Sequence, residues 1–456
     1  MQWVVLRISP ILLLLIGSCW AETTPDFVHD VAPILSRFGC NGSACHGKAE
    51  GQNGFKLSVF GFDPDGDYAA LTQQARGRRV MLGAPEQSLM LAKATGELPH
   101  EGGVQMEVGS RPYQLLTKWI EAGAPFDLGD ERNVVSLRLE PNREVVKFEE
   151  ERQLKAIATF ENGQEEDVTW LAEFHANEPG MADVDEHGAV KIGSVVGQAA
   201  VMARFQGQVA VFQAMIPRPA VEDDDPFPSR PVNNAIDELV DKNLRELNLH
   251  PSELCDDPAF LRRVYLDLIG RLPTPDETRA FLAEPDRTKL VDELLERDEY
   301  ADLMALRWAD LLRVERSVLG HRDAFAYYSW IREAMAENKP LDQFVDELLT
   351  ASGPLNQAPA GHFYRVAKAG ENAATAAQVF LGVRITCAEC HQHPYDQWTQ
   401  QDYHGLRAYF EVPKPKKITE TQFALASTGK PTVKHPRTGD PIYAHPLGET
   451  MPEEAA

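Results

Sequence analysis

The sequence predicts a multidomain chain with an α-helical first unit, a β-sandwich in the middle and a mainly α-helical C-terminal unit. Apolar residues recur with a helical period of about 3.6 up to residue 130, alternate with a period near 2 over residues 133–217, and return to the helical period after residue 234. An acidic, proline-rich stretch at residues 218–233 separates the last two parts and is typical of a stiff linker. The length of 456 residues suits about three domains.

The first predicted unit, residues 24–130, begins and ends with a helix. The opening helix places Phe27 and Val31 on one face, and Pro33 is expected to kink or restart it because proline has no backbone N–H. A closing helix is expected over residues 111–122, and a Gly-rich loop region lies between the two helices. The apolar face of the closing helix is formed by Leu115, Leu116, Trp119 and Ile120.

The middle and last parts carry clear local signals. Asn162-Gly163 predicts a hairpin within residues 133–217, and short strands separated by turns are typical of a β-sandwich. In the predicted helical unit, residues 234–412, Asp257-Pro258 opens a helix that Gly270 ends, and Thr274 begins a capping box. Residues 413–456 show no strong period, so we expect an irregular tail and a truncated chain.

Residues 1–21 have the pattern of a signal peptide. Arg7 provides a positive start, and the apolar run from Ile11 to Ile16 is far shorter than the ~20 residues that span a bilayer. Ile16-Gly17-Ser18-Cys19 also resembles a lipobox, which gives lipidation of Cys19 as the alternative to simple cleavage. We therefore expect an exported protein, periplasmic or at the cell surface, with no transmembrane span and either free or lipid-anchored.

The charge of the chain argues against nucleic acid as a partner. There are 45 Lys and Arg residues against 69 Asp and Glu, a formal net charge of -24. No basic stripe with interleaved aromatic residues is present to neutralise phosphates.

Cysteine spacing carries most of the functional information. Of the six cysteines, Cys19 lies in the leader and Cys255 stands alone. The other four form two tight pairs, each followed by histidine, which is the pattern of chemical sites rather than of a disulfide scaffold. The two clusters are Cys40, Cys45 and His46, and Cys387, Cys390 and His391.

Both clusters predict covalently bound haem c, one or two groups in all. Cys387–His391 is a C-x-x-C-H sequence, in which two thiols reach the vinyl groups of a porphyrin and the adjacent imidazole ligates the iron. Cys40–His46 has two additional residues between its thiols, and the small residues at 42–44 allow the loop to bulge. A redox or metal-binding thiol pair and a structural disulfide remain the alternatives at both places.

A second axial ligand is expected for the first site. His100, in a turn before the closing helix, is the first choice, and Met106 is the second. Near the second cluster, His393 and His404 are expected to be solvated or supporting side chains rather than ligands. Zinc is the weaker interpretation, because these ligands are crowded in sequence.

Three stretches resemble known families. Residues 27–125, with Asn53-Gly54-Phe55-Lys56-Leu57, resemble the planctomycete cytochrome c domain in its wide-spaced form. Asp167-Val168-Thr169-Trp170 in the middle part resembles the bacterial group 2 immunoglobulin-like domain. Phe260–Thr274 and Cys387–Asp396 resemble a second planctomycete cytochrome-labelled domain, a helical family of unsettled function. The resemblance implies a cytochrome c-like domain, an Ig-like spacer or adhesion module, and a helical domain.

The favoured function is electron transfer by an exported c-type haem protein, with His46 and His391 as proximal ligands and an unidentified redox partner protein. The alternative is a cell-surface binding or scaffold protein whose Ig-like domain contacts envelope polysaccharide or protein, with disulfide-paired cysteines and no haem. Enzymatic activity of the helical unit is a third hypothesis, because His391, His393 and Asp396 cluster in the sequence, although they show no order of nucleophile, base and orienting residue.

Overall fold

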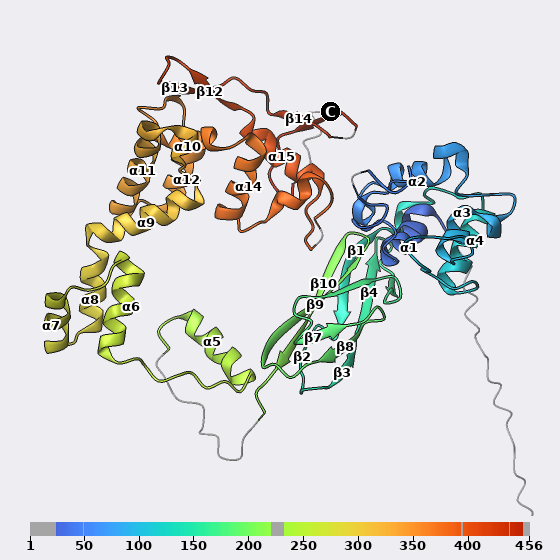
Figure 1. Ribbon diagram of the computed structural model, residues 1–456, viewed down its shortest axis with the longest axis horizontal. Coiled ribbons are helices and arrows are strands. Elements are labelled where there is room, and N and C mark those ends of the chain that lie inside the picture. Colours follow the sequence, from blue (N-terminus) through green and yellow to red (C-terminus); the bar gives the residue numbers. More distant parts are fainter. Residues whose placement is uncertain (1–23, 49, 220–231, 394, 437, 450–456) are drawn as a thin grey trace, which may run out of the picture. The chain divides into compact units, whose positions relative to one another are not determined.

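The computed structural model describes residues 24–48, 50–219, 232–393, 395–436 and 438–449 (Figure 1). Two compact units, residues 1–133 and 134–456, make up the chain. Helices and several small sheets are both present, so the mixed, multidomain architecture is confirmed in this broad sense. The predicted leader, with Cys19, lies outside the described residues, as does most of the predicted linker. None of the described helices has the length and apolarity needed to cross a bilayer.

The N-terminal unit consists of short helices joined by long loops. In chain order these are η1 (Phe27–Val31), α1 (Ala32–Arg37), η2 (Val59–Gly61), α2 (Pro64–Thr72), η3 (Gln74–Gly77), η4 (Pro85–Gln87), α3 (Leu89–Ala94), α4 (Arg111–Glu121) and η5 (Asp130–Arg132). The restart expected at Pro33 is present, because the wide turn η1 ends at Val31 and Pro33 lies in the first turn of α1.

The opening and closing helices share one apolar core. Phe27 on η1 and Trp119 on α4 are both fully buried, with ring centroids 6.1 Å apart. Tyr68 on α2 packs against Phe27 edge to face at 5.4 Å. The indole N–H of Trp119 donates to the Pro125 carbonyl at 2.9 Å. These contacts hold the two ends of the unit together around the loops between them.

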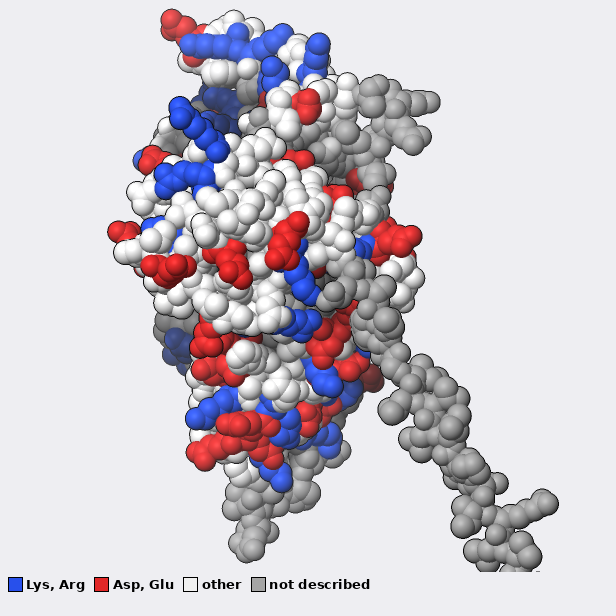
Figure 2. Space-filling view, turned by 90° about the vertical axis from the view of Figure 1, so that its right-hand side faces the viewer, with Lys and Arg blue, Asp and Glu red and all other residues white. Residues whose placement is uncertain are grey.

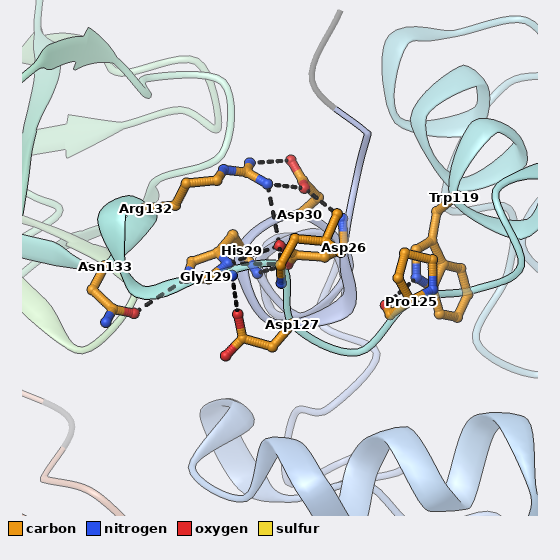
Figure 3. A network of polar contacts seen from close by, with 10 residues as sticks. Asp26, His29, Asp30, Trp119, Pro125, Asp127, Gly129, Arg132 and Asn133 are labelled. Atoms are coloured by element: carbon orange, nitrogen blue, oxygen red, sulfur yellow. Dashed lines mark hydrogen bonds and ion pairs between the residues drawn. The ribbon is translucent and has the colours of Figure 1, made fainter. Parts of the chain in front are cut away.

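A buried ion network joins residues at the start and the end of the N-terminal unit (Figure 3). His29 Nδ1 lies 3.0 Å from a carboxylate oxygen of Asp26, and His29 Nε2 lies 3.1 Å from the side-chain oxygen of Asn133. Arg132 donates two hydrogen bonds of 2.8 Å to Asp30 and one of 3.4 Å to Asp26. Both nitrogens of His29 face oxygen acceptors, so the protonated ring satisfies both.

The network moves two pKa values in opposite directions. Burial acts to lower the pKa of His29, but its bonds to Asp26 and Asn133 outweigh burial and raise that pKa above 6.5. Burial acts to raise the pKa of Asp26, but hydrogen bonds from His29 and the charges of His29 and Arg132 lower it below 3.8. Both shifts favour the charged ion pair at mildly acidic pH.

The strands of the second unit come first in its sequence. They are β1 (Val134–Glu140), β2 (Arg143–Val145), β3 (Glu151–Gln153), β4 (Lys155–Phe160), β5 (Glu165–Asp167), β6 (Glu173–Ala176), β7 (Ala182–Val184), β8 (Ala189–Ile192), β9 (Gly197–Phe205) and β10 (Gln208–Ile216). Their hydrogen bonds form three small sheets, ordered β1-β4-β5, β2-β10-β9-β6 and β3-β8-β7. The hairpin predicted at Asn162-Gly163 joins β4 to β5, and Gly163 has the positive φ of 79° that such a turn requires.

Helices dominate the rest of this unit. They are α5 (Ala235–Glu246), α6 (Asp257–Ile269), α7 (Pro275–Ala283), α8 (Arg287–Leu295), α9 (Asp298–Leu311), α10 (Arg316–Leu319), α11 (His321–Ala336), α12 (Leu341–Thr350), η6 (Pro359–His362), α13 (Phe363–Val366), α14 (Ala369–Phe380), η7 (Ile385–Glu389) and α15 (Gln400–Phe410). The capping box at Thr274 and the left-handed Gly270 are present as predicted. The cap of α6 is the side chain of Asp256, which accepts from the Ala259 N–H, rather than that of Asp257.

The stretch after residue 412 differs from the irregular tail that the sequence predicts. It contains β12 (Pro413–Lys417), β13 (Phe423–Ser427), β14 (Thr432–Lys434) and β15 (Pro441–Tyr443), and β11 (Gly353–Pro354) pairs with β13. β12 is an edge strand, where proline is tolerated because its missing N–H faces away from the ladder. Leu425 on β13 belongs to the helical core, so long-range packing defines these strands.

We predict that His29→Ala lowers the free energy of unfolding of the N-terminal unit by about 2 kcal/mol at pH 5.5. The pKa of His29 is higher in the folded chain than in the unfolded chain, so the charged ring stabilises the fold fully at pH values below the unfolded pKa. This contribution is lost as pH rises through the folded pKa, so the decrease in unfolding free energy on His29→Ala is smaller at pH 8.5. The Asp26 contribution disappears only in stronger acid, as pH falls through its lowered pKa. Hydrogen exchange of amides in residues 27–37 of the full chain measures the effect.

The matched control is the exposed His187, whose replacement by Ala leaves this protection unchanged. A loss on His29→Ala that is equal at pH 5.5 and 8.5 contradicts a charged His29.

Candidate functional site

A cavity of about 440 Å³ lies in the N-terminal unit. Its volume falls in the range of about 300–1,000 Å³ that is usual for small-molecule sites. Apolar side chains, among them Leu35, Leu71 and Leu116, form much of its wall. The wall also includes every residue that the sequence predicts for the first site: Cys40, Cys45, His46, His100 and Met106.

Backbone hydrogen bonds shape the Cys40–His46 loop. The Cys40 N–H donates to the Leu35 carbonyl at 2.8 Å, so the loop starts directly from the end of α1. The His46 N–H donates to the Cys40 carbonyl at 3.0 Å and closes the loop on itself. The Leu57 N–H then donates to the His46 carbonyl at 2.9 Å, which fixes the end of the loop against the next segment.

Gly47 is required by this packing rather than by its backbone angles. A Cβ at this position would lie 2.0 Å from the Asn41 carbonyl oxygen, a distance that no side chain tolerates. Only glycine lets the chain pass the backbone of the loop this closely.

The ring of His46 is held by its Nδ1, which lies 3.0 Å from the Phe55 carbonyl oxygen. Donation of the Nδ1 proton to that carbonyl leaves the lone pair on Nε2. Burial lowers the pKa of His46, and the nearby His100 and Arg79 lower it further, against the opposing effect of the Phe55 carbonyl. His46 is therefore a neutral imidazole near pH 7, which is the form that binds metal.

His100 lies near His46 in the wall of the same cavity. The two ring centroids are 6.3 Å apart and the ring planes differ by 11°. His100 Nδ1 lies 3.2 Å from the Gly103 carbonyl, so the same tautomer leaves its Nε2 with a lone pair. Metal-binding histidines commonly donate their second nitrogen to a backbone carbonyl in this way.

The separation of the two ring centroids is one that two imidazole ligands of a single metal ion can have. An imidazole nitrogen binds a first-row metal at about 2 Å, so two imidazoles on opposite sides of one ion have centroids about 6 Å apart. With two thiols in the same cavity wall, the donor set fits a haem attached through Cys40 and Cys45. Met106 is buried in the same wall, but the ring that lies nearly parallel to that of His46 is His100.

The thiols of this site are free and half-buried. Burial, together with the neighbouring Cys45 thiol, raises the pKa of Cys40 to about 11. Cys40 is therefore a neutral thiol at physiological pH, and its reactivity as a thiolate is suppressed.

The charge of the cavity wall differs from that of the chain. Acidic and basic side chains are intermixed on the face drawn in Figure 2. The charged side chains among the described lining residues of the cavity are Arg78, Arg79 and Lys93, all cationic. In a chain with a net charge of -24, this arrangement points to an anionic ligand.

The second cluster has a different environment. Ile385 and Ala388 of η7 are buried and anchor the backbone, whereas Cys387 and Cys390 are exposed free thiols. His391 is half-buried, and its Nδ1 lies 2.7 Å from the Gln392 carbonyl. The structure thus presents the two thiols to solvent while it holds the segment between them.

His393 and His404 differ from one another near this cluster. The Tyr395 N–H donates to His393 Nδ1 at 3.3 Å in a surface turn. His404 on α15 is buried, not solvated, and neither of its ring nitrogens has a hydrogen-bond partner among the described residues. Burial, assisted by the charge of Arg407, lowers the pKa of His404, so the ring is neutral.

One comparison with known proteins bears on the second unit. Residues 235–414 match the family model PSCyt2, a protein of unknown function (DUF1549). The matched stretch runs from α5 to the start of β12 and contains Cys387, Cys390 and His391. The resemblance carried by Phe260–Thr274 and Cys387–Asp396 is confirmed over this stretch. No curated protein matches the chain.

Sequence reasoning did not identify Phe55, Arg78 or Arg79 as parts of the site. Arg78-Arg79 is an ordinary basic pair in a Gly-rich loop, and nothing local indicates that one side chain turns inward. The sequence offers one indication: in a chain with net negative charge, a pair of adjacent arginines occurs in the same predicted unit as a cysteine cluster.

We predict that in the reduced, haem-free chain Cys40 reacts with iodoacetamide at pH 8 at least about 10-fold more slowly than the exposed Cys387, because burial keeps Cys40 protonated. Peptide mass spectrometry over a time course measures both rates. In guanidinium the two rates should converge, and equal rates in the folded chain contradict the raised pKa of Cys40.

We predict that Gly47→Ala opens the cysteine loop, because its new Cβ meets backbone that cannot yield, at a cost of about 2–4 kcal/mol. The alkylation rate of Cys40 should rise at least several-fold. Gly83→Ala is the control, since a Cβ there meets no atom within 4 Å and the rate should not change. An unchanged rate in Gly47→Ala would show that the loop has another conformation.

Proposed function

We propose that this chain is an exported c-type haem protein that takes part in electron transfer, with a haem in the cavity of the N-terminal unit. The observation that supports this proposal is that two thiols and two parallel imidazoles from separate loops line one cavity. The residues come from positions 40–46 and from position 100, so the fold brings them together.

Each residue has a distinct role under this proposal. Cys40 and Cys45 attach the porphyrin edge, His46 is the proximal ligand and His100 the distal ligand, with Met106 as the alternative. The bound haem iron supplies a one-electron couple. Phe55 and Gly103 hold the imidazole tautomers through their carbonyl oxygens, and the apolar wall excludes water from the iron.

The finer fold assignments belong to the same proposal. We assign residues 24–130 to a cytochrome c-like domain, because helices open and close the unit and the cysteine loop follows the first of them. We assign residues 133–217 to an Ig-like β-sandwich, supported by the three small sheets of short, mainly antiparallel strands. Its role would be that of a spacer, or of a contact with envelope polysaccharide or protein.

The second cluster supports a weaker form of the proposal. His391 carries the same hydrogen bond from Nδ1 to a carbonyl as His46 does, which favours a second haem at Cys387, Cys390 and His391. The exposure of both thiols favours an accessible redox pair as the competing role.

A redox partner protein is expected to dock near the first cavity. In the segment that carries His100 and Met106, the alternating residues Val104 and Val108 are 65% and 72% exposed. Exposed apolar side chains beside a redox site suit a transient protein contact. Export follows from the signal-peptide pattern of residues 1–21.

We predict that the chain produced with c-type cytochrome maturation carries covalent haem. The mass should increase by one haem for the first site, and the visible spectrum should show the Soret band of a low-spin, six-coordinate iron. In the Cys40→Ala/Cys45→Ala double variant, the mass of the first covalently attached haem should be absent under denaturing conditions, because both thioether bonds are removed. Cys255→Ala, which alters a cysteine outside both clusters, should leave the spectrum and mass unchanged.

The axial ligand is tested with two further variants. His100→Ala should convert the ferric spectrum to high spin, whereas Met106→Ala should leave it low spin. A second haem mass that disappears in Cys387→Ala/Cys390→Ala assigns the second site. A colourless chain with paired cysteines would overturn the proposal in favour of the surface scaffold.

A further inference from the structure

Arg79 is a buried guanidinium in the wall of the cavity. Its side chain is almost fully enclosed, with 7% of the residue exposed. Nη1 donates to the carbonyls of Ala70 at 2.7 Å and Gln74 at 3.3 Å, and Nη2 donates to the Gly54 carbonyl at 3.0 Å. These bonds fix the guanidinium plane but leave one N–H of Nη2 and the Nε–H available among the described residues.

Among the residues that the structure describes, no carboxylate forms an ion pair with Arg79. Its three hydrogen-bond acceptors are neutral carbonyls, and none of the ion pairs among the described residues includes it. Burial of an ionised group without an opposite charge costs several kcal/mol, and in folded proteins such groups are normally paired. The chain has 69 acidic residues, and yet none of the described carboxylates is paired with Arg79.

The guanidinium lies close to the proposed haem ligand. It stacks on the Phe55 ring at 4.4 Å from the ring centroid, and the same ring lies 4.5 Å from the centroid of His46. Arg79 and His46 are thus both in contact with Phe55, within about 9 Å of one another. Both side chains are thus close enough for one macrocycle to reach His46 with its metal and Arg79 with a group on its edge.

A second cation extends this part of the wall. Arg78 lines the cavity beside Arg79, and its side chain is exposed. Two adjacent guanidinium groups, one buried and one at the solvent boundary, provide donors for two anionic groups on one ligand. Arg76 lies two residues before Arg78 in the same loop but is not among the lining residues of the cavity, so its replacement is a matched control for the two arginines.

We propose that Arg79 and Arg78 form an anion subsite that binds the carboxylate groups of the cavity ligand. Under the proposed function, on which this inference rests, those groups are the two haem propionates. The thiols of Cys40 and Cys45 and the guanidinium groups would then act on different edges of one ring and fix its orientation. The anion also completes the hydrogen bonding of Arg79.

Non-covalent porphyrin binding separates the charge contribution from the thioether bonds. The probes are iron protoporphyrin IX, a diacid, and its neutral dimethyl ester, titrated into the full-length Cys40→Ala/Cys45→Ala chain and followed by the Soret band. We expect the diacid to bind at least about 10-fold more tightly than the ester. The ester has no carboxylates, so it cannot form the charge-assisted hydrogen bonds with the two guanidinium groups.

The arginine variants assign that preference to the subsite. Arg79→Gln and Arg78→Gln should each reduce the ratio of the two dissociation constants several-fold, Arg79→Lys should retain much of it, and Arg76→Gln should leave it unchanged. The ester has no carboxylates for the arginines to bind, so an affinity for the ester equal to that of the parent chain shows that the variant still folds around the cavity. Arg78→Gln tests the proposal at an exposed position even if Arg79→Gln does not fold.

The outcomes keep this inference apart from the proposed function. Equal affinity for diacid and ester, or a preference that survives both arginine replacements, overturns the anion subsite and leaves haem binding intact. Failure of both porphyrins to bind also overturns the anion subsite, whereas the mass and colour of the matured chain decide the proposed function separately. A preference that Arg76→Gln also removes would show a diffuse electrostatic effect rather than a subsite.

Discussion

The closure of the Cys40–His46 loop is the constraint on which the candidate site depends. A backbone bond from the His46 N–H to the Cys40 carbonyl turns the chain so that thiols and imidazole belong to the wall of one cavity. The next bond, from the Leu57 N–H to the His46 carbonyl, brings Phe55 into position to hold the imidazole. The absence of a side chain at Gly47 permits both, since any Cβ there would collide with the backbone of the loop.

The packing of η1 against α4 is the framework for this loop. Phe27 and Trp119 fill the space between η1 and α4. The buried network of Asp26, His29 and Arg132 adds hydrogen bonds and ion pairs between the two ends of the unit (Figure 3). The apolar contacts provide most of the stabilisation, because a buried ion pair recovers little more than its desolvation cost. The network instead makes the closure of the unit dependent on pH.

The two cysteine clusters show that the spacing of the cysteines in the sequence does not by itself indicate which cluster lines a cavity that could hold a ligand. The C-x-x-C-H sequence at Cys387 has the stricter spacing, yet its thiols face solvent. The wider cluster at Cys40 has the weaker sequence signal but lines a cavity, with a second imidazole near the first. The match of residues 235–414 to a family of unknown function leaves the chemistry of the second cluster to experiment.

The sequence by itself determined the features that depend on neighbouring residues. The restart of the helix at Pro33, the hairpin at Asn162-Gly163 and the capping box at Thr274 follow from local backbone preferences, and the structure has all three. The expected cluster at residues 40–46 was also local, because its residues are close together in the chain. The edge strand β12 was missed, since its prolines give no strand pattern without the pairing of β13.

Only the tertiary structure decided which distant residues meet at the site. The spacing of 6.3 Å between His46 and His100 depends on how two loops pack on the core, and no local pattern encodes that distance. The inward position of Arg79 depends on carbonyls from three separate positions, Gly54, Ala70 and Gln74. Side-chain burial is a collective property of the packed unit, so the charge of the cavity wall became visible only in the folded chain.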